Sequence, residues 1–86
     1  MYRKVPDGLT EREVEGELVI LHGATGEVHQ LNQVAACIWR NLKQDTSAEM
    51  LVGKVAEQFE VDRKTAQDDV DRFLANLAAL KLIEVV

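Results

Sequence analysis

Short apolar runs broken by glycine turns fill the first third of the chain and predict strands. We expect strands at residues 11–14, 17–22 and 27–31, with turns at 15–16 and 23–26. The middle run, Leu18-Val19-Ile20-Leu21, is apolar on both faces, so we expect it in the central strand, covered more than a two-sided solvent strand would be. Strands joined by such short turns form an antiparallel meander.

From Asn32 onward the apolar period is helical. We predict a helix over residues 33–42 with Asn32 as its N-cap, and a second helix that opens with Thr46 as the cap of a capping box with Glu49. A third helix runs from the cap Asp62 to residue 80, and residues 82–86 form a last extended stretch. The third helix has the strongest apolar stripe, which consists of Ala66, Val70, Phe73, Leu74, Leu77 and Leu80.

The predicted fold class is therefore α+β. A three-stranded antiparallel meander is followed by three helices, of which the last two resemble a winged helix-turn-helix. Residues 1–10 are expected to be an N-terminal arm, because Pro6-Asp7-Gly8 is a turn signal. Residues 11–86 are expected to form a single domain, since 86 residues leave room for one.

Composition and charge indicate the cellular environment that we expect for the domain. The net charge is −5, and the single cysteine, Cys37, allows no disulfide within the chain. The first residues have no apolar signal segment, and the longest apolar run without a charge, residues 31–39, is too short to span a bilayer. We expect a soluble cytoplasmic protein with no membrane partner.

Side chains that could support chemistry are few and scattered. His22 and His29 fall on adjacent strands but have no further ligands for a metal, and Cys37 lies in the most apolar helix. Asp68, Asp69 and Asp71 are expected on a solvated helix surface. We therefore expect no catalytic residue, no metal and no cofactor.

Nucleic acid is a disfavoured partner. In a helix-turn-helix the second helix reads the major groove, and here that helix has three basic and four acidic side chains, a formal charge of −1. A phosphate backbone repels such a surface.

Several features together resemble the PqqD family, the peptide chaperones of pyrroloquinoline quinone biosynthesis, and the wider leader-peptide recognition elements of ribosomally made, modified peptides. They are Leu31-Asn32 at the end of the third strand, the apolar run Ala35-Ala36-Cys37-Ile38-Trp39, Thr46 before the second helix, and Asp69-Val70-x-x-Phe73-Leu74-x-x-Leu77. The chain departs from the family at two turns. Gln44-Asp45 stands where Asp-Gly is common, and Lys81 stands where glycine is common.

The resemblance implies a peptide-binding adaptor that is not an enzyme. Such a domain binds a precursor (leader) peptide and presents it to a modifying enzyme, which in the quinone pathway is a radical S-adenosylmethionine enzyme. The family's peptide adds as a strand beside the third strand, next to the last helix. The contacts carried over to this chain are Glu27, Val28, His29, Gln30 and Leu31 on the strand, and Lys64, Gln67, Asp68 and Asp71 on the helix.

Two alternatives stay open at this point. One is a winged-helix nucleic-acid-binding domain, which salt-dependent DNA binding would reveal. The other is a structural dimerisation module, since the sequence fits either a monomer or a homodimer.

Overall fold

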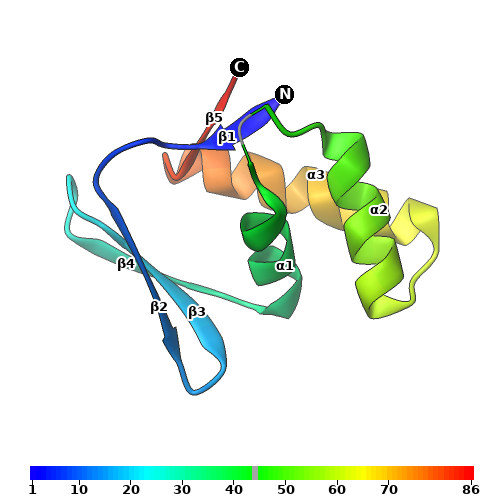
Figure 1. The fold of residues 1–86 in the computed structure, drawn as a ribbon, viewed down its shortest axis with the longest axis horizontal. Coiled ribbons are helices and arrows are strands. Elements are labelled where there is room, and N and C mark those ends of the chain that lie inside the picture. The colour runs from blue at the N-terminus through cyan, green and yellow to red at the C-terminus, as the bar shows by residue number, and fades with distance from the viewer. Residues whose placement is uncertain (44) are drawn as a thin grey trace.

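The computed structural model describes residues 1–43 and 45–86, and its elements follow the predicted α+β order (Figure 1). The strands and helices are β1 (Tyr2–Lys4), β2 (Leu9–Val14), β3 (Glu17–His22), β4 (Glu27–Leu31), α1 (Gln33–Asn41), α2 (Ala48–Phe59), α3 (Arg63–Ala79) and β5 (Ile83–Val85).

The predicted meander is confirmed as an antiparallel sheet in the order β2-β3-β4. The β2–β3 turn places Glu15 and Gly16 at positive φ, as a tight two-residue hairpin requires. Strand β3 is central, as predicted, and the cover that the helices provide lies on one of its faces. Leu18 and Ile20 are buried against the helices, whereas Leu21 on the opposite face is 40% exposed. The helices thus cover one face of the sheet only.

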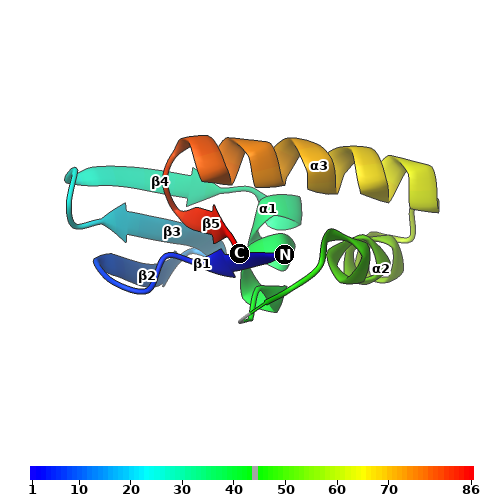
Figure 2. The ribbon, with the colours of Figure 1, turned by 90° about the horizontal axis from the view of Figure 1, so that it is seen from above.

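The first ten residues are not the separate arm that the turn signal predicted. Strand β1 pairs antiparallel with β5, so both ends of the chain build one small sheet (Figure 2). Tyr2 also exchanges two backbone hydrogen bonds with Thr46. Strand β2 begins at Leu9 rather than at residue 11. The expected boundary between residues 10 and 11 therefore falls inside a strand.

Two helix starts agree with the prediction and one does not. The side chains of Asn32 and Asp62 accept hydrogen bonds from the third residue of α1 and α3, as expected of N-caps. The N-cap of α2 is Ser47 rather than Thr46. Thr46 is buried, and its Oγ1 accepts a hydrogen bond from the amide of Lys43 at 2.7 Å. Thr46 therefore fixes the turn before α2, and the predicted capping box does not form.

Both family departures lie at strained turn positions. Asp45 has φ 55° and Lys81 has φ 61°, in the left-handed region that glycine adopts most easily. The turns keep the backbone shape that glycine favours even though both residues carry a Cβ. Gln44 lies outside the described residues.

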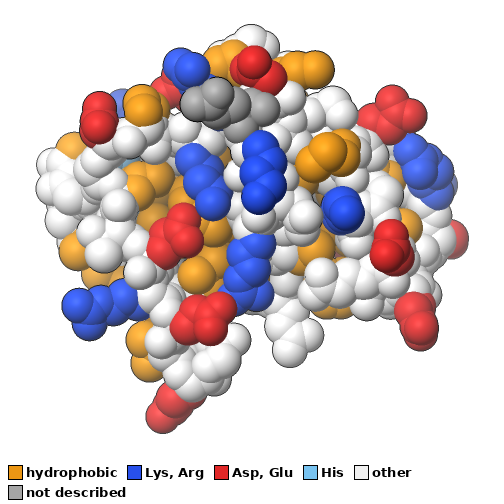
Figure 3. All heavy atoms as spheres, in the orientation of Figure 1, with side chains coloured by type: hydrophobic (Ala, Val, Ile, Leu, Met, Phe, Trp, Pro, Cys, Tyr) orange, Lys and Arg blue, Asp and Glu red, His pale blue; other side chains and the backbone are white. Residues whose placement is uncertain are grey.

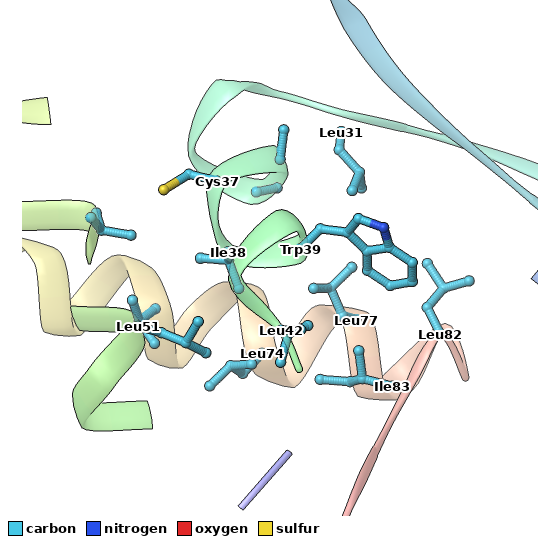
Figure 4. Packing of buried hydrophobic residues seen from close by; sticks show 14 of the residues in the cluster. Leu31, Cys37, Ile38, Trp39, Leu42, Leu51, Leu74, Leu77, Leu82 and Ile83 are labelled. Atoms are coloured by element: carbon cyan, nitrogen blue, oxygen red, sulfur yellow. The ribbon is translucent and has the colours of Figure 1, made fainter. Parts of the chain in front are cut away.

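The core lies between the inner face of the sheet and the three helices. Trp39, Ile38, Leu51, Leu77 and Leu82 are fully buried there, and Figure 4 shows them converging from α1, α2, α3 and the segment before β5. Within the described residues, no helix is long and apolar enough to cross a membrane.

Candidate functional site

Strand β4 has an open edge whose free backbone groups can be identified. The amide of Gly23 donates to Gly8 O, so residues 8 and 23 form a hydrogen-bonded pair. Hydrogen-bonded pairs alternate along an antiparallel ladder, so the backbone groups of residues 10, 12 and 14 bond to those of residues 21, 19 and 17. The remaining residues of β3 then bond to Glu27, His29 and Leu31. Val28 and Gln30 are left with outward N–H and C=O groups. An edge of this kind is a template for another strand.

The C-terminal half of α3 lies along this open edge. Figure 2 shows the C-terminal end of α3 beside the end of β4, and residues of both elements line a groove of about 390 Å³. Phe73 and Leu80 are only half-buried, which leaves apolar surface available in the groove. The lining residues are Val28, His29, Gln30, Leu31, Asn32, Ala35, Phe73, Asn76, Leu77 and Leu80.

The lining residues of this groove include no Asp, Glu, Lys or Arg. The polar atoms available are backbone groups and the side chains of His29, Gln30, Asn32 and Asn76. Apolar contact and backbone hydrogen bonds therefore dominate recognition here, so a ligand would bind with little dependence on salt.

The structure brings together only half of the predicted site. Val28 to Leu31 line the groove, and Glu27 lies at the start of the same strand. Gln67 and Asp71 instead line a separate groove between α2 and α3, of about 340 Å³. Lys64 and Asp68 form an exposed ion pair at 3.4 Å. The four predicted contacts on α3 are in its first half, whereas its second half faces β4.

The helix residues that line the groove beside β4 were not among the predicted contacts, although the sequence contained a signal for them. Phe73 and Leu80 belong to the predicted apolar stripe, yet they are less buried than Ala66, Val70, Leu74 and Leu77. An apolar stripe on a helix that is wider than the part buried in the core indicates that the helix has a second apolar surface. The sequence alone did not show which flank remained uncovered.

The histidines and the cysteine do not assemble a reactive centre. His22 is buried, and neither of its ring nitrogens has a hydrogen-bond partner among the described residues. His29 lies opposite Ile20 on the neighbouring strand rather than opposite His22. Within the described residues no group of three potential ligands could hold a metal. Burial raises the pKa of the Cys37 thiol, opposite to what a nucleophilic thiolate requires.

Comparison with known proteins agrees with this arrangement. The family described as coenzyme PQQ synthesis protein D (PqqD) matches residues 17–83. The chain belongs to the PqqD family. This PqqD-family chain is also similar to TbiB1, solved in complex with the TbiA(beta) leader peptide, with 31% identity, a TM-score of 0.83 and 96% of each chain covered.

A second similar structure is a lasso peptide synthetase B1 complexed with the leader peptide. It is 25% identical, has a TM-score of 0.83, and the alignment covers 98% of each chain. No curated protein matches the sequence.

Proposed function

We propose that this PqqD-family domain binds the leader segment of a precursor peptide as an added strand on β4. The observation that carries the proposal is the open edge of β4 beside an uncharged groove against α3. The two similar structures, both leader-peptide complexes, support the same function. Val28 and Gln30 bind the peptide backbone, and the half-buried Phe73 and Leu80 contact its side chains.

The magnitudes indicate what the peptide has to supply. Val28 and Gln30 offer four backbone hydrogen bonds at most, each worth roughly 1 kcal/mol net. Micromolar affinity requires about 8 kcal/mol. The remaining ~4 kcal/mol corresponds to roughly 160 Å² of buried apolar surface, before the cost of association is counted. The peptide must therefore carry at least two apolar side chains on the face toward α3, two residues apart because strand side chains alternate.

The domain acts as an adaptor that presents the peptide, and it catalyses no reaction itself. The family and the leader-peptide complexes support an adaptor, and the buried Cys37 argues against a nucleophile. The partner is a modifying enzyme. In the quinone pathway that the resemblance implies, this partner is a radical S-adenosylmethionine enzyme, which supplies the chemistry and its own cofactors.

A proline substitution on β4 tests strand addition. Gln30→Pro removes one outward N–H and leaves the bonds between β3 and β4 in place. Glu13→Pro is the matched control, because Glu13 also points its amide outward, on the opposite edge strand. A peptide selected from a displayed random library on the wild-type domain is titrated against both variants by fluorescence anisotropy.

We expect Gln30→Pro to weaken binding at least tenfold and Glu13→Pro to leave it unchanged. Leu77→Ala is a poorer choice because Leu77 also belongs to the core. Asn76→Ala changes the groove without touching the core and should weaken binding about two- to fivefold. Equal affinity of the wild type and Gln30→Pro would contradict the proposal, provided that circular dichroism shows both to be folded.

A further inference from the structure

A second hollow lies where the lower ends of several elements meet. The β2–β3 turn, the start of α1 and the end of α2 border it, and Figure 1 shows these three ends along the lower side of the molecule. Its volume is about 660 Å³, larger than that of the groove beside β4. Apolar side chains of Leu18, Leu31 and Ala36 line it, together with polar groups from Asn32, Gln33 and Gln58.

This hollow adjoins the groove beside β4. Leu31 and Asn32 line both spaces. The five residues of β4 span roughly 16 Å at the usual rise of a strand. A peptide longer than this span continues past Leu31, passes Asn32 and reaches the hollow. The groove and the hollow therefore meet at Leu31 and Asn32, next to the start of α1.

Unlike the groove, the hollow is acidic. Glu15 and Glu17 line it, and both are exposed. The Arg40 side chain also lines it but forms an ion pair with Glu13. Because Arg40 is paired with Glu13, it does not neutralise the two carboxylates that line the hollow, and Glu15 is fixed in a tight turn at φ 54°. Lysine and arginine complement such a site, because their aliphatic stems fit apolar walls while their charges reach the carboxylates.

We propose that this hollow holds the part of the bound peptide that flanks the added strand, and that it selects lysine or arginine there. The inference rests on the proposed function, because the flank arrives only if the strand segment binds to β4. Apolar residues of the peptide fix its position in the groove, and the basic flank adds specificity through Glu15 and Glu17.

The test uses the library-selected peptide as a core with three residues added at one end. Separate peptides carry three lysines, three glutamates or three serines, at either end. Each is titrated at about 50 mM salt against the wild type and against Glu15→Gln/Glu17→Gln. The control Asp7→Asn/Asp45→Asn changes the net charge equally at exposed sites that do not line the hollow.

At one end only, we expect lysines to tighten binding about two- to fivefold relative to serines, which is the upper part of the range for an exposed charge pair. Glu15→Gln/Glu17→Gln abolishes this gain, and the control double variant keeps it. A spin label at the end of that flank broadens the amide signals of Gly16 and Gln33.

The outcomes separate the two proposals. A core peptide with serine flanks that is unaffected by Gln30→Pro contradicts strand addition on β4. If the serine-flanked peptide binds β4 as expected but lysines give no gain in affinity, only the proposal for the hollow is overturned. The same holds if lysines give an equal gain in both double variants, because such a gain reflects the general net charge of −5. Amide shifts at the hollow that depend on protein concentration and not on the flank assign it to a second copy of the chain and also overturn the proposal.

Discussion

Trp39 shows how a single polar atom is accommodated in the core. The side chain is fully buried, yet its Nε1 donates to Glu11 Oε1 at 2.7 Å. Lys4 Nζ lies 4.8 Å from the centre of the indole ring and 3.3 Å from the same carboxylate oxygen. One carboxylate on β2 therefore holds α1 and the end of β1 together.

Replacing this carboxylate should destabilise the domain more than replacing its neighbour. We expect Glu11→Ala to lower the free energy of unfolding by about 1–2 kcal/mol, because the indole N–H loses its acceptor. Glu11→Gln keeps an acceptor oxygen and should recover part of the loss. Glu13→Ala breaks only an exposed ion pair with Arg40 and should cost less than about 1 kcal/mol. Urea unfolding followed by Trp39 fluorescence measures all three, and equal effects of Glu11→Ala and Glu13→Ala would disprove the assignment.

Cys37 should behave as a core residue and not as a reactive thiol. Desolvation by burial is the largest influence on its pKa and raises it, and the Asn41 side-chain hydrogen bond opposes this. Below the raised pKa the folded chain therefore keeps a protonated, unreactive thiol. We expect reaction with Ellman's reagent at pH 8 only as fast as the chain unfolds, and immediate reaction in urea. Cys37→Ala should cost a few kcal/mol at most and leave peptide binding unchanged. Rapid labelling of the native protein, or loss of binding in folded Cys37→Ala, would count against this role.

At the scale of elements, the sequence predicted the strands and helices that depend on neighbouring residues, but not the pairing of strands far apart in the chain. Alternation and turn residues identified β3 and β4, and Asn32 and Asp62 marked two helix starts, because these signals act between neighbours in sequence. Strand β1 is three residues long, and its partner residues lie 79 to 83 positions away in the sequence, which no local period reveals. The capping of α2 failed to follow the pattern because Tyr2 and Lys43 engage Thr46.

The same distinction between local and long-range signals applies to the candidate site. Strand order alone places Val28 to Leu31 at an edge, whereas the helix residues that line the groove depend on the direction in which α3 packs. Residues 64 and 80 of a helix stand about 24 Å apart, so the two ends of α3 offer separate surfaces to a peptide. Phe73 and Leu80 were visible in the apolar stripe but could not be distinguished there from the core.

Removing β1 should weaken the fold without removing the groove. Deleting residues 1–4 breaks the bonds between Tyr2 and Thr46 and uncovers Leu82 and Ile83, which are buried. We expect a loss of about 2 kcal/mol, since a few net hydrogen bonds of roughly 1 kcal/mol each are lost and some chain entropy is regained. Arg3→Ala/Glu84→Ala removes only a half-exposed ion pair and should cost less than about 1 kcal/mol. Thermal unfolding by circular dichroism distinguishes them, and an unchanged midpoint after the deletion would show that β1 adds nothing.

On the scale of the whole molecule, acidic side chains outnumber basic ones and the net charge is −5. On the face in Figure 3 several basic side chains lie near the middle with acidic side chains beside them, and Lys4 and Arg40 are paired with Glu11 and Glu13. On α3, Arg72 pairs with Asp69 at 2.7 Å. The half of this helix that carries Phe73 to Leu80 faces β4.

We therefore expect no DNA binding by this domain. A fluorescent duplex titrated at about 50 mM salt, a condition that favours electrostatic binding, should show no micromolar complex. The same titration with the library-selected peptide serves as the positive control. Micromolar DNA binding that weakens steeply with added salt would show that the surface charge has been misjudged.

The pairing of β1 with β5 also makes the domain nearly a closed ring. The amide of Val86 donates to Met1 O at 2.8 Å, so the chain enters and leaves the fold at one point (Figure 1). A short glycine-serine bridge between these ends should give a circular permutant that folds when new ends are opened in the exposed turn at Ala24-Thr25. The same geometry lets the whole domain be inserted into a surface loop of a host enzyme. Both junctions then lie at the β1–β5 sheet, and the host fixes the direction in which the edge of β4 faces.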